Sequence, residues 1–195
     1  MNRLILYAFS AVLAFSAPVA AATVQPLPAP DMTGGKPLMQ ALKERRTARV
    51  FGTREIDDNT LSEMLWAAWG VNRPDSKKRT VPTAMNRQNI DVYVLKADGV
   101  WRYDGQKHVL EQAVAEDLRS AADKTAPVTL LYVADESIVS GMHAGSIYQN
   151  VGLFCASKGL NNVVRRSFDR ETLNKALRLD SGRQVLAAQS VGWSE

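Results

Sequence analysis

The chain has 195 residues, 46% of them hydrophobic, with 24 Lys and Arg residues against 20 Asp and Glu residues for a formal net charge of +4. This length suits one domain with a sizeable core, and its basic residues are scattered, which argues against nucleic-acid binding. Cys155 is the only cysteine, so an intramolecular disulfide is excluded. Its place on the apolar face of a predicted helix favours a buried structural thiol over a reactive one.

Residues 1–22 have the organisation of a secretory signal peptide. Arg3 supplies a positive charge, an apolar run covers residues 4–17, and Ala20-Ala21-Ala22 offers a small-residue cleavage site. The alternative is an uncleaved membrane anchor, but a comfortable span needs ~20 apolar residues. We therefore expect an exported protein, periplasmic or secreted, with no stable membrane anchor after cleavage.

Residues 23–36 are rich in Pro and Gly and carry little helical pattern. This composition predicts a flexible leader, followed by a single domain over residues 37–195. Pro37 suits the first turn of a helix, and apolar residues follow it at helical spacing.

A second helix is expected from Thr60-Leu61-Ser62-Glu63, which has the pattern of a capping box, to Gly70. The polar segment from Val71 to Asn89 then predicts a long loop. Connections of this length are uncommon in compact domains unless they bind something.

Two strands are expected at Asp91–Leu95 and Val100–Tyr103, and Asp98-Gly99 between them is a strong hairpin signal. Residues Gln112–Ala122 are predicted to form a helix. The apolar run Pro127–Val133 predicts a buried central strand.

The best helical pattern covers Met142–Lys158, and Gly159 ends it. Asp169 is expected to cap a last helix, and Val185–Val191 to form a final strand. A hairpin, a buried strand and clustered helices without regular βαβ alternation indicate an α+β fold.

Two short segments could carry a binding function. Arg45-Arg46-Thr47-Ala48-Arg49 gathers three guanidinium groups around a hydroxyl. Guanidinium binds phosphate oxygens bidentately and keeps its charge. The alternative is a solvated helix end whose cations suit the helix dipole. Pro82-Thr83-Ala84-Met85-Asn86 places small and polar residues in the predicted loop, where they can hydrogen-bond along a polar tail.

Other chemistries find little support. The chain has no P-loop, no dinucleotide-binding or nucleophile-elbow motif and no zinc-ligand spacing. His143 and Cys155 share a predicted helix but lie ~18 Å apart by helical rise, which excludes a dyad there. His108 is expected at the surface, and Asp57-Asp58 are expected to be solvated residues at a helix start.

A series of motifs follows one another along the chain: Arg45-Arg46-Thr47-x-Arg49-x-Phe51, Leu65-Trp66-Ala67-Ala68-x-Gly70-Val71-Asn72-Arg73, Pro82-Thr83-Ala84-x-Asn86, Ala126-Pro127-Val128, Gly145-x-x-Tyr148-Gln149-Asn150-x-x-Leu153, Gly159-Leu160-Asn161-Asn162-Val163-Val164 and Val191-Gly192. In this order they resemble the nitroreductase superfamily of FMN-dependent flavoenzymes. The stretch Trp66–Arg73 and the strand pair through Tyr103-Asp104 look most like its SagB/ThcOx-type branch.

The resemblance implies a nitroreductase-like α+β fold with a central, mostly antiparallel sheet flanked by helices, and a homodimer with FMN at the subunit interface. It also implies three groups of cofactor-binding residues. The phosphate and ribityl chain would be held by Arg45, Arg46, Thr47 and Arg49. The loop that reaches the flavin, in many members from the partner subunit, would contain Pro82, Thr83, Ala84 and Asn86. The segment beside the isoalloxazine ring would contain Val163, Val164 and Arg165.

The implied activity is ping-pong transfer of two electrons from a reductant such as NAD(P)H to a small organic acceptor such as a quinone or nitroaromatic. FMN carries that chemistry, so no catalytic side chain and no metal are expected. The alternative is a non-catalytic flavin- or anion-binding protein derived from the same fold.

The predicted helix with Gly145 and Gly152 is expected at the dimer interface, with each site shared between two chains. The alternative is that this helix is simply core and that its glycines admit a neighbouring strand.

Overall fold

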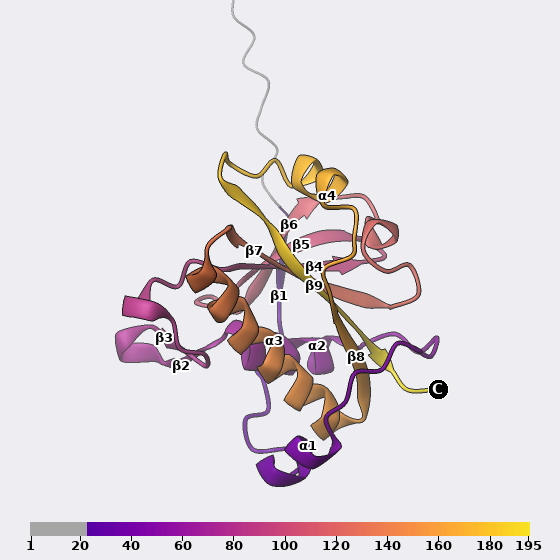
Figure 1. The fold of residues 1–195 in the computed structure, drawn as a ribbon. Coiled ribbons are helices and arrows are strands. Elements are labelled where there is room, and N and C mark those ends of the chain that lie inside the picture. Colours follow the sequence, from indigo (N-terminus) through magenta and orange to yellow (C-terminus); the bar gives the residue numbers. More distant parts are fainter. Residues whose placement is uncertain (1–22) are drawn as a thin grey trace, which may run out of the picture.

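The computed structural model describes residues 23–195, and the expected signal peptide, residues 1–22, lies outside the described residues. A seven-stranded antiparallel sheet forms the centre of the protein (Figure 1). In spatial order its strands are β1 (Val24–Pro26), β6 (Val109–Val114), β5 (Gly99–Asp104), β4 (Asp91–Lys96), β7 (Val128–Asp135), β9 (Arg183–Trp193) and β8 (Leu160–Arg165).

Helices cover both faces of this sheet. On one face, α2 (Asp58–Trp69) and the long α3 (Ile138–Lys158) contribute to the main hydrophobic core, and α1 (Leu38–Glu44) contacts α3. On the other face, α4 (Arg170–Ala176) buries Leu173 in a second core. The predicted α+β class with an antiparallel sheet is confirmed.

The continuously apolar sequence of strand β7 is explained by its burial on both faces of the sheet. Leu130 and Tyr132 face the core under α2 and α3, whereas Leu131 and Val133 face the core under α4. A strand that is buried on both faces needs apolar residues at every position. The predicted buried central strand and the predicted hairpin are both confirmed, because β4 and β5 pair directly and Lys96 lies opposite Gly99.

The long helix α3 begins earlier than its pattern indicates. The Ser137 side chain caps it by accepting a hydrogen bond from the Ser140 amide, and Gly159 ends it in the left-handed conformation with φ +79°. The apolar face that holds Ala144, Ile147 and Cys155 is buried in the protein's own core. Burial of Cys155 confirms the predicted structural thiol.

The start of α2 differs from the prediction. Asp57, three residues before Thr60, is the N-cap, and its carboxylate accepts hydrogen bonds from the Thr60 amide and hydroxyl at 2.9 and 3.0 Å. The proposed capping box at Thr60 is therefore wrong. Asp57 and Asp58 lie at a helix start as expected, because a carboxylate there satisfies free amide groups.

The predicted helix over Gln112–Ala122 is also wrong. Its first residues belong to β6, which pairs with β5 and β1, and only a short 3₁₀ turn, η3 (Arg119–Ala121), follows. The segment contains good helix formers, but strand pairing on both sides overrides a propensity of a few tenths of a kcal/mol per residue.

Two segments that were expected to be irregular carry structure. Within the predicted leader, β1 pairs with β6 and Leu27 enters the main core. The predicted loop from Val71 contains the small hairpin of β2 (Val71–Arg73) and β3 (Lys78–Arg79) and two 3₁₀ turns, η1 (Pro74–Ser76) and η2 (Ala84–Asn86). No helix within residues 23–195 has the length and apolar character needed to cross a bilayer.

Candidate functional site

The arginine segment leaves α1 and runs beside strand β8. The Ala48 amide donates to the Asn162 carbonyl at 2.9 Å, and Asn161 Nδ2 donates to the Val50 carbonyl at 2.8 Å. Each hydrogen bond satisfies a backbone group that has no partner within the segment. The structure thus places residues 48–50 beside Asn161 and Asn162, which directly precede the predicted site segment 163–165.

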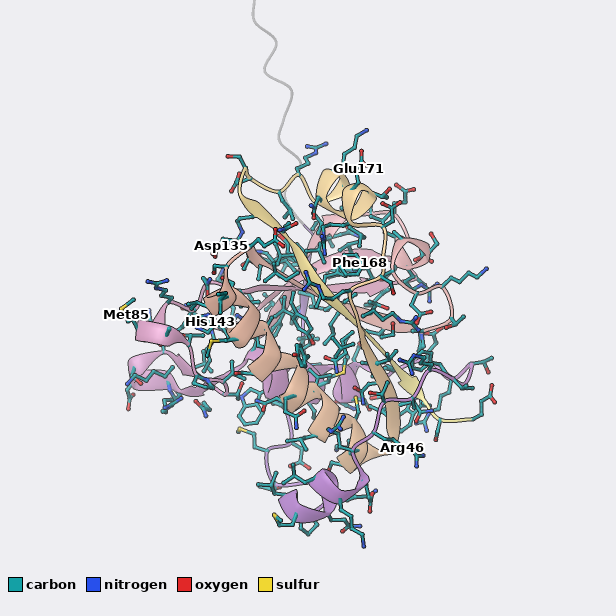
Figure 2. The ribbon with its side chains drawn as sticks, in the orientation of Figure 1. Arg46, Met85, Asp135, His143, Phe168 and Glu171 are labelled. Carbon is teal, nitrogen blue, oxygen red and sulfur yellow. The ribbon has the colours of Figure 1, made fainter. Side chains whose placement is uncertain are left out.

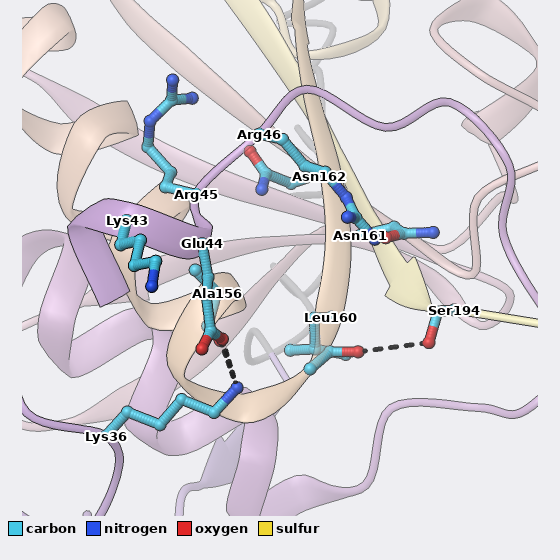
Figure 3. A pocket seen from close by; sticks show the side chains of 11 residues that line it. Lys36, Lys43, Glu44, Arg45, Arg46, Ala156, Leu160, Asn161, Asn162 and Ser194 are labelled. Atoms are coloured by element: carbon cyan, nitrogen blue, oxygen red, sulfur yellow. Dashed lines mark hydrogen bonds and ion pairs between the residues drawn. The ribbon is translucent and has the colours of Figure 1, made fainter. Parts of the chain in front are cut away.

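The guanidinium groups of this segment are free to bind an anion. Arg45, Arg46 and Arg49 are exposed, and none forms an ion pair within residues 23–195. The nearby carboxylate of Glu44 is bound instead to Lys36 Nζ at 2.6 Å. Arg45 and Arg46 line a cavity of about 540 Å³ with Asn161 and Asn162 (Figure 3). Positive charge without an internal counterion favours a negatively charged ligand here.

Gly152 of α3 lies beside the Arg45 side chain. A Cβ atom at residue 152 would stand 3.5 Å from Arg45 Cδ and 3.7 Å from Asn162 Oδ1. The glycine therefore lies against the Arg45 side chain and also against Asn162 of the neighbouring strand β8. At Gly145 the corresponding space holds the ring of Tyr148, whose hydroxyl oxygen would lie 3.4 Å from a Cβ atom.

Strand β8 turns alternate side chains to opposite faces of the sheet. Asn162 and Val164 lie on the α3 side. Val163 packs instead with Phe51 and Ala126, and Arg165 Nη2 donates to Asp123 Oδ2. Of the predicted residues 163–165, only Val164 therefore presents its side chain to the α3 side.

A second cavity, of about 470 Å³, lies farther along β8 and shares no lining residue with the first. Val164 and Arg166 line it from the strand side, and Ala144 and Tyr148 line it from α3. Strand rise places Val164 about 7 Å beyond Asn162. A charged pocket and a more apolar pocket thus follow one another along the same strand, as an elongated ligand with an anionic end requires.

The loop Pro82–Asn86 lies elsewhere in the subunit. Figure 2 shows Met85 and Arg46 at opposite ends of α3. The Ala84 amide donates to His143 Nε2 at 2.7 Å, near the start of that helix. His143 and Gly152 are nine residues apart, which is about 14 Å along a helix axis. The structure does not bring this loop to the arginine segment of the same chain.

Sequence reasoning missed several residues that shape these regions. His143, Asn89 and Asp135 form a hydrogen-bonded chain beneath the loop. A signal for His143 is present in the sequence, since it lies one turn before Ile147 on the apolar face, where a polar residue needs a partner.

His108 is not the surface residue that was expected. It is half-buried; its Nδ1 lies 2.8 Å from the Tyr103 hydroxyl, and its Nε2 lies 2.7 Å from Ser62 Oγ and 3.1 Å from the Pro28 carbonyl. This cluster joins the N-terminal segment to α2 and β5. Ser62 is fully buried, so the contact is structural.

Comparisons with known proteins agree with this fold. The sequence profile of the nitroreductase family matches residues 42–193. A protein from Ralstonia eutropha JMP134 assigned to the nitroreductases is 36% identical, with a TM-score of 0.82 over 88% of this chain and 90% of its own. No curated protein matches.

Two more distant structures share the fold. One, from Desulfovibrio desulfuricans, is assigned to the nitroreductases and was solved with FMN; it is 22% identical, with a TM-score of 0.59 over 83% of this chain and 91% of its own. The other is the Escherichia coli microcin synthetase McbBCD complex with truncated pro-MccB17, 18% identical, with a TM-score of 0.65 over 100% of this chain and 79% of its own. The chain described here belongs to the nitroreductase family.

Proposed function

We propose that the protein is an exported FMN-dependent oxidoreductase. The observation that carries this proposal is the cavity beside β8 that Arg45 and Arg46 line, neither of them in an ion pair within residues 23–195, with a less polar pocket farther along the same strand. A phosphate group suits the first and a planar ring suits the second. Export rests on the signal-peptide pattern of residues 1–22.

The residues present fit FMN. Arg45, Arg46 and Arg49, with the Thr47 hydroxyl, would hold the phosphate and the polar chain. Val164 and Tyr148 would face the ring system. When bound, FMN supplies two-electron transfer between a reductant, such as NAD(P)H, and an acceptor, such as a quinone or nitroaromatic. The protein itself would bind and orient the reactants and shield the site from water.

We further propose a homodimer, because the loop Pro82–Asn86 cannot reach the arginine segment of its own chain. If two α3 helices pair antiparallel about a two-fold axis, each loop comes to the arginine end of the other subunit. The exposed face of α3 begins with Ile138 and Met142, which are 86% and 67% exposed, and Met85 on the loop is 80% exposed. Such a group of large apolar side chains is typical of an interaction surface.

The proposed function is tested by cofactor content and turnover. Purified protein should be yellow, and mass spectrometry of the released cofactor should identify FMN. Arg45→Ala and Arg49→Ala should lose the flavin band while keeping a cooperative thermal transition. Arg178→Ala, in a distant exposed turn, is the matched control. Protein that stays colourless after incubation with FMN would contradict the proposal.

The shared site can be tested by mixing subunits. Light scattering should give a dimer, and a mixture of Arg45→Ala and Asn86→Ala chains should recover some FMN binding, because one of the two sites in a mixed dimer is intact. A monomer that binds FMN tightly would contradict the shared site.

A second candidate is a flavin- or anion-binding protein without turnover. Arg166 favours it, because its exposed guanidinium lines the pocket where an acceptor would enter and could occupy that space. Dithionite reduction followed by rapid reoxidation with a quinone would exclude this candidate. Membership of the SagB/ThcOx-type branch is likewise a proposal.

A further inference from the structure

A chain of hydrogen bonds joins the loop Pro82–Asn86 to the start of α3. The Ala84 amide donates to His143 Nε2 at 2.7 Å, and His143 Nδ1 lies 2.7 Å from Asn89 Oδ1. Asn89 Nδ2 donates to Asp135 Oδ1 at 3.1 Å and to Ser140 Oγ at 2.7 Å. His143 is 4% exposed and Ser140 is fully buried. The middle of this hydrogen-bonded series is therefore buried, whereas Ala84 and Asp135 at its two ends are exposed.

The Asp135 carboxylate, at the outer end of this series of hydrogen bonds, determines which group donates and which accepts in each of them. Hydrogen bonds from Ser137, Ser140 and Asn89 lower the pKa of the Asp135 carboxyl to about 2, so this group is an ionised acceptor. Asn89 must then turn its NH₂ group to Asp135 and its oxygen to His143. The oxygen can only accept, so His143 carries its proton on Nδ1.

The other imidazole nitrogen is consequently a bare acceptor. A backbone amide can only donate, and Nε2 without a proton is the group that the Ala84 amide needs. If the imidazole were doubly protonated, its Nε2–H group and the Ala84 N–H group would be two donors facing each other. Asn89 and the Ala84 amide therefore select the neutral imidazole with its proton on Nδ1. In this tautomer, Nε2 can accept the hydrogen bond that anchors the loop.

The loop needs such an anchor because its backbone is strained. Met85, Asn86 and Gln88 all have positive φ, at +50°, +54° and +45°. Left-handed conformations cost about 1–2 kcal/mol for residues other than glycine and persist only where the surroundings determine them. Inside the loop, the Gln88 amide donates to Thr83 Oγ1 at 3.2 Å. The Ala84 hydrogen bond fixes the loop to α3.

We propose that His143 is a positioning residue, which fixes Thr83 and Asn86 in the conformation that the neighbouring subunit's flavin requires. The inference rests on the proposed FMN function and on the shared site. His143 touches neither cofactor nor substrate; it acts through the Ala84 amide. The same helix would then serve both halves of the site, holding its own loop at His143 and the Arg45 side chain at Gly152.

Three substitutions of His143 distinguish the role of its Nε2 atom from the role of its Nδ1 atom. His143→Gln can keep an acceptor at the Nε2 position and loses the contact to Asn89. His143→Asn keeps a donor near the Nδ1 position and loses the acceptor for Ala84. His143→Leu loses both. Asp135→Asn changes the exposed outer end and should weaken the same hydrogen-bonded series less severely.

The first measurement is hydrogen–deuterium exchange of the Ala84 amide in each full-length variant without added FMN. His143→Asn and His143→Leu should exchange roughly 10-fold or more faster than wild type, whereas His143→Gln should stay near wild type. The second measurement is FMN release after dilution, which should follow the same order, with rescue by Gln. A thermal transition close to wild type in His143→Gln and His143→Asn confirms that both are folded.

The outcomes distinguish this inference from the function it rests on. Wild-type protein that binds no FMN contradicts the proposed function, and the exchange order still tests the anchor. Equal exchange in all variants overturns the anchor. Exchange in the expected order with unchanged FMN release overturns the positioning role.

Discussion

The Arg45 side chain lies against Gly152 of α3, where a Cβ atom would stand 3.5 Å from Arg45 Cδ. At this distance a methyl group at residue 152 makes an ordinary contact with Arg45, whereas a longer side chain needs space that the arginine occupies. Because Arg45 also lines the cavity that we assign to the flavin phosphate, a larger residue at position 152 moves a binding group while the arginine itself is unchanged in sequence.

Gly152→Leu should displace Arg45 and release FMN, because the longer side chain needs the space that the guanidinium stem occupies. Gly152→Ala is the matched control: its Cβ makes an ordinary contact, and removal of a helical glycine should stabilise the fold by about 0.5–1 kcal/mol. FMN content after gel filtration and the midpoint of urea unfolding measure both effects. Full FMN retention in Gly152→Leu would contradict this assignment.

Tyr132→Phe should destabilise the centre of the fold. The Tyr132 hydroxyl donates to Gln189 Oε1, and Gln189 is fully buried, with its amide bound to Asn162 Oδ1 at 3.0 Å. Removing the hydroxyl leaves a buried oxygen without a donor, which costs about 1–3 kcal/mol. Chemical denaturation measures this loss.

Tyr93→Phe on the adjacent strand is the control for that experiment. The Tyr93 hydroxyl donates no hydrogen bond within residues 23–195, so this change should be nearly neutral. Equal losses in the two variants would show that the hydroxyl of Tyr132 has no special role. A loss in Tyr132→Phe alone would also predict weaker FMN binding, since Asn162 lines the arginine cavity.

Local patterns were sufficient for elements whose signals lie within the element itself. The β4–β5 hairpin, strand β7 and the end of α3 at Gly159 all follow from turn residues and apolar runs. Strand β6 was missed because its residues favour a helix in isolation, and only pairing with β5 and β1 decides otherwise.

In the candidate site, too, local patterns predict some features, whereas others depend on residues distant in the sequence. The arginine segment was visible as a cluster of one residue type, but its place beside β8 depends on hydrogen bonds to Asn161 and Asn162, more than 100 residues away in the chain. His143 was considered only as a partner for Cys155. Its contacts to Ala84 and Asn89 join segments more than 50 residues apart, which no local pattern records.

Cys155 should not react with thiol reagents in the folded protein. The residue is fully buried, and burial raises the pKa of its thiol, so little thiolate forms. Incubation with a maleimide at pH 8 should give no labelled protein by mass spectrometry, and addition of denaturant should give one label. Rapid labelling under native conditions would show that α3 separates from the core.

Acid should destabilise the protein through His108. Burial lowers the pKa of this imidazole, and the Pro28 carbonyl opposes the shift only in part. In the unfolded chain an imidazole binds a proton near pH 6.5. Between that value and the lower pKa of the folded state, the unfolded chain binds more protons, so the free energy of unfolding falls as the pH falls.

Urea titrations at several pH values between 7.5 and 4.5 would measure this dependence. His108→Gln removes the titrating group, so its unfolding free energy should change less over this window, whatever its stability at pH 7.5. In the folded protein the His108 ring contacts Ser62, Tyr103 and the Pro28 carbonyl in one cluster. The difference in pH dependence between wild type and His108→Gln therefore reports on this cluster. Ser62→Ala, which weakens this cluster but keeps the imidazole, should retain a pH dependence. Equal pH dependence in wild type and His108→Gln would assign the acid sensitivity to other groups.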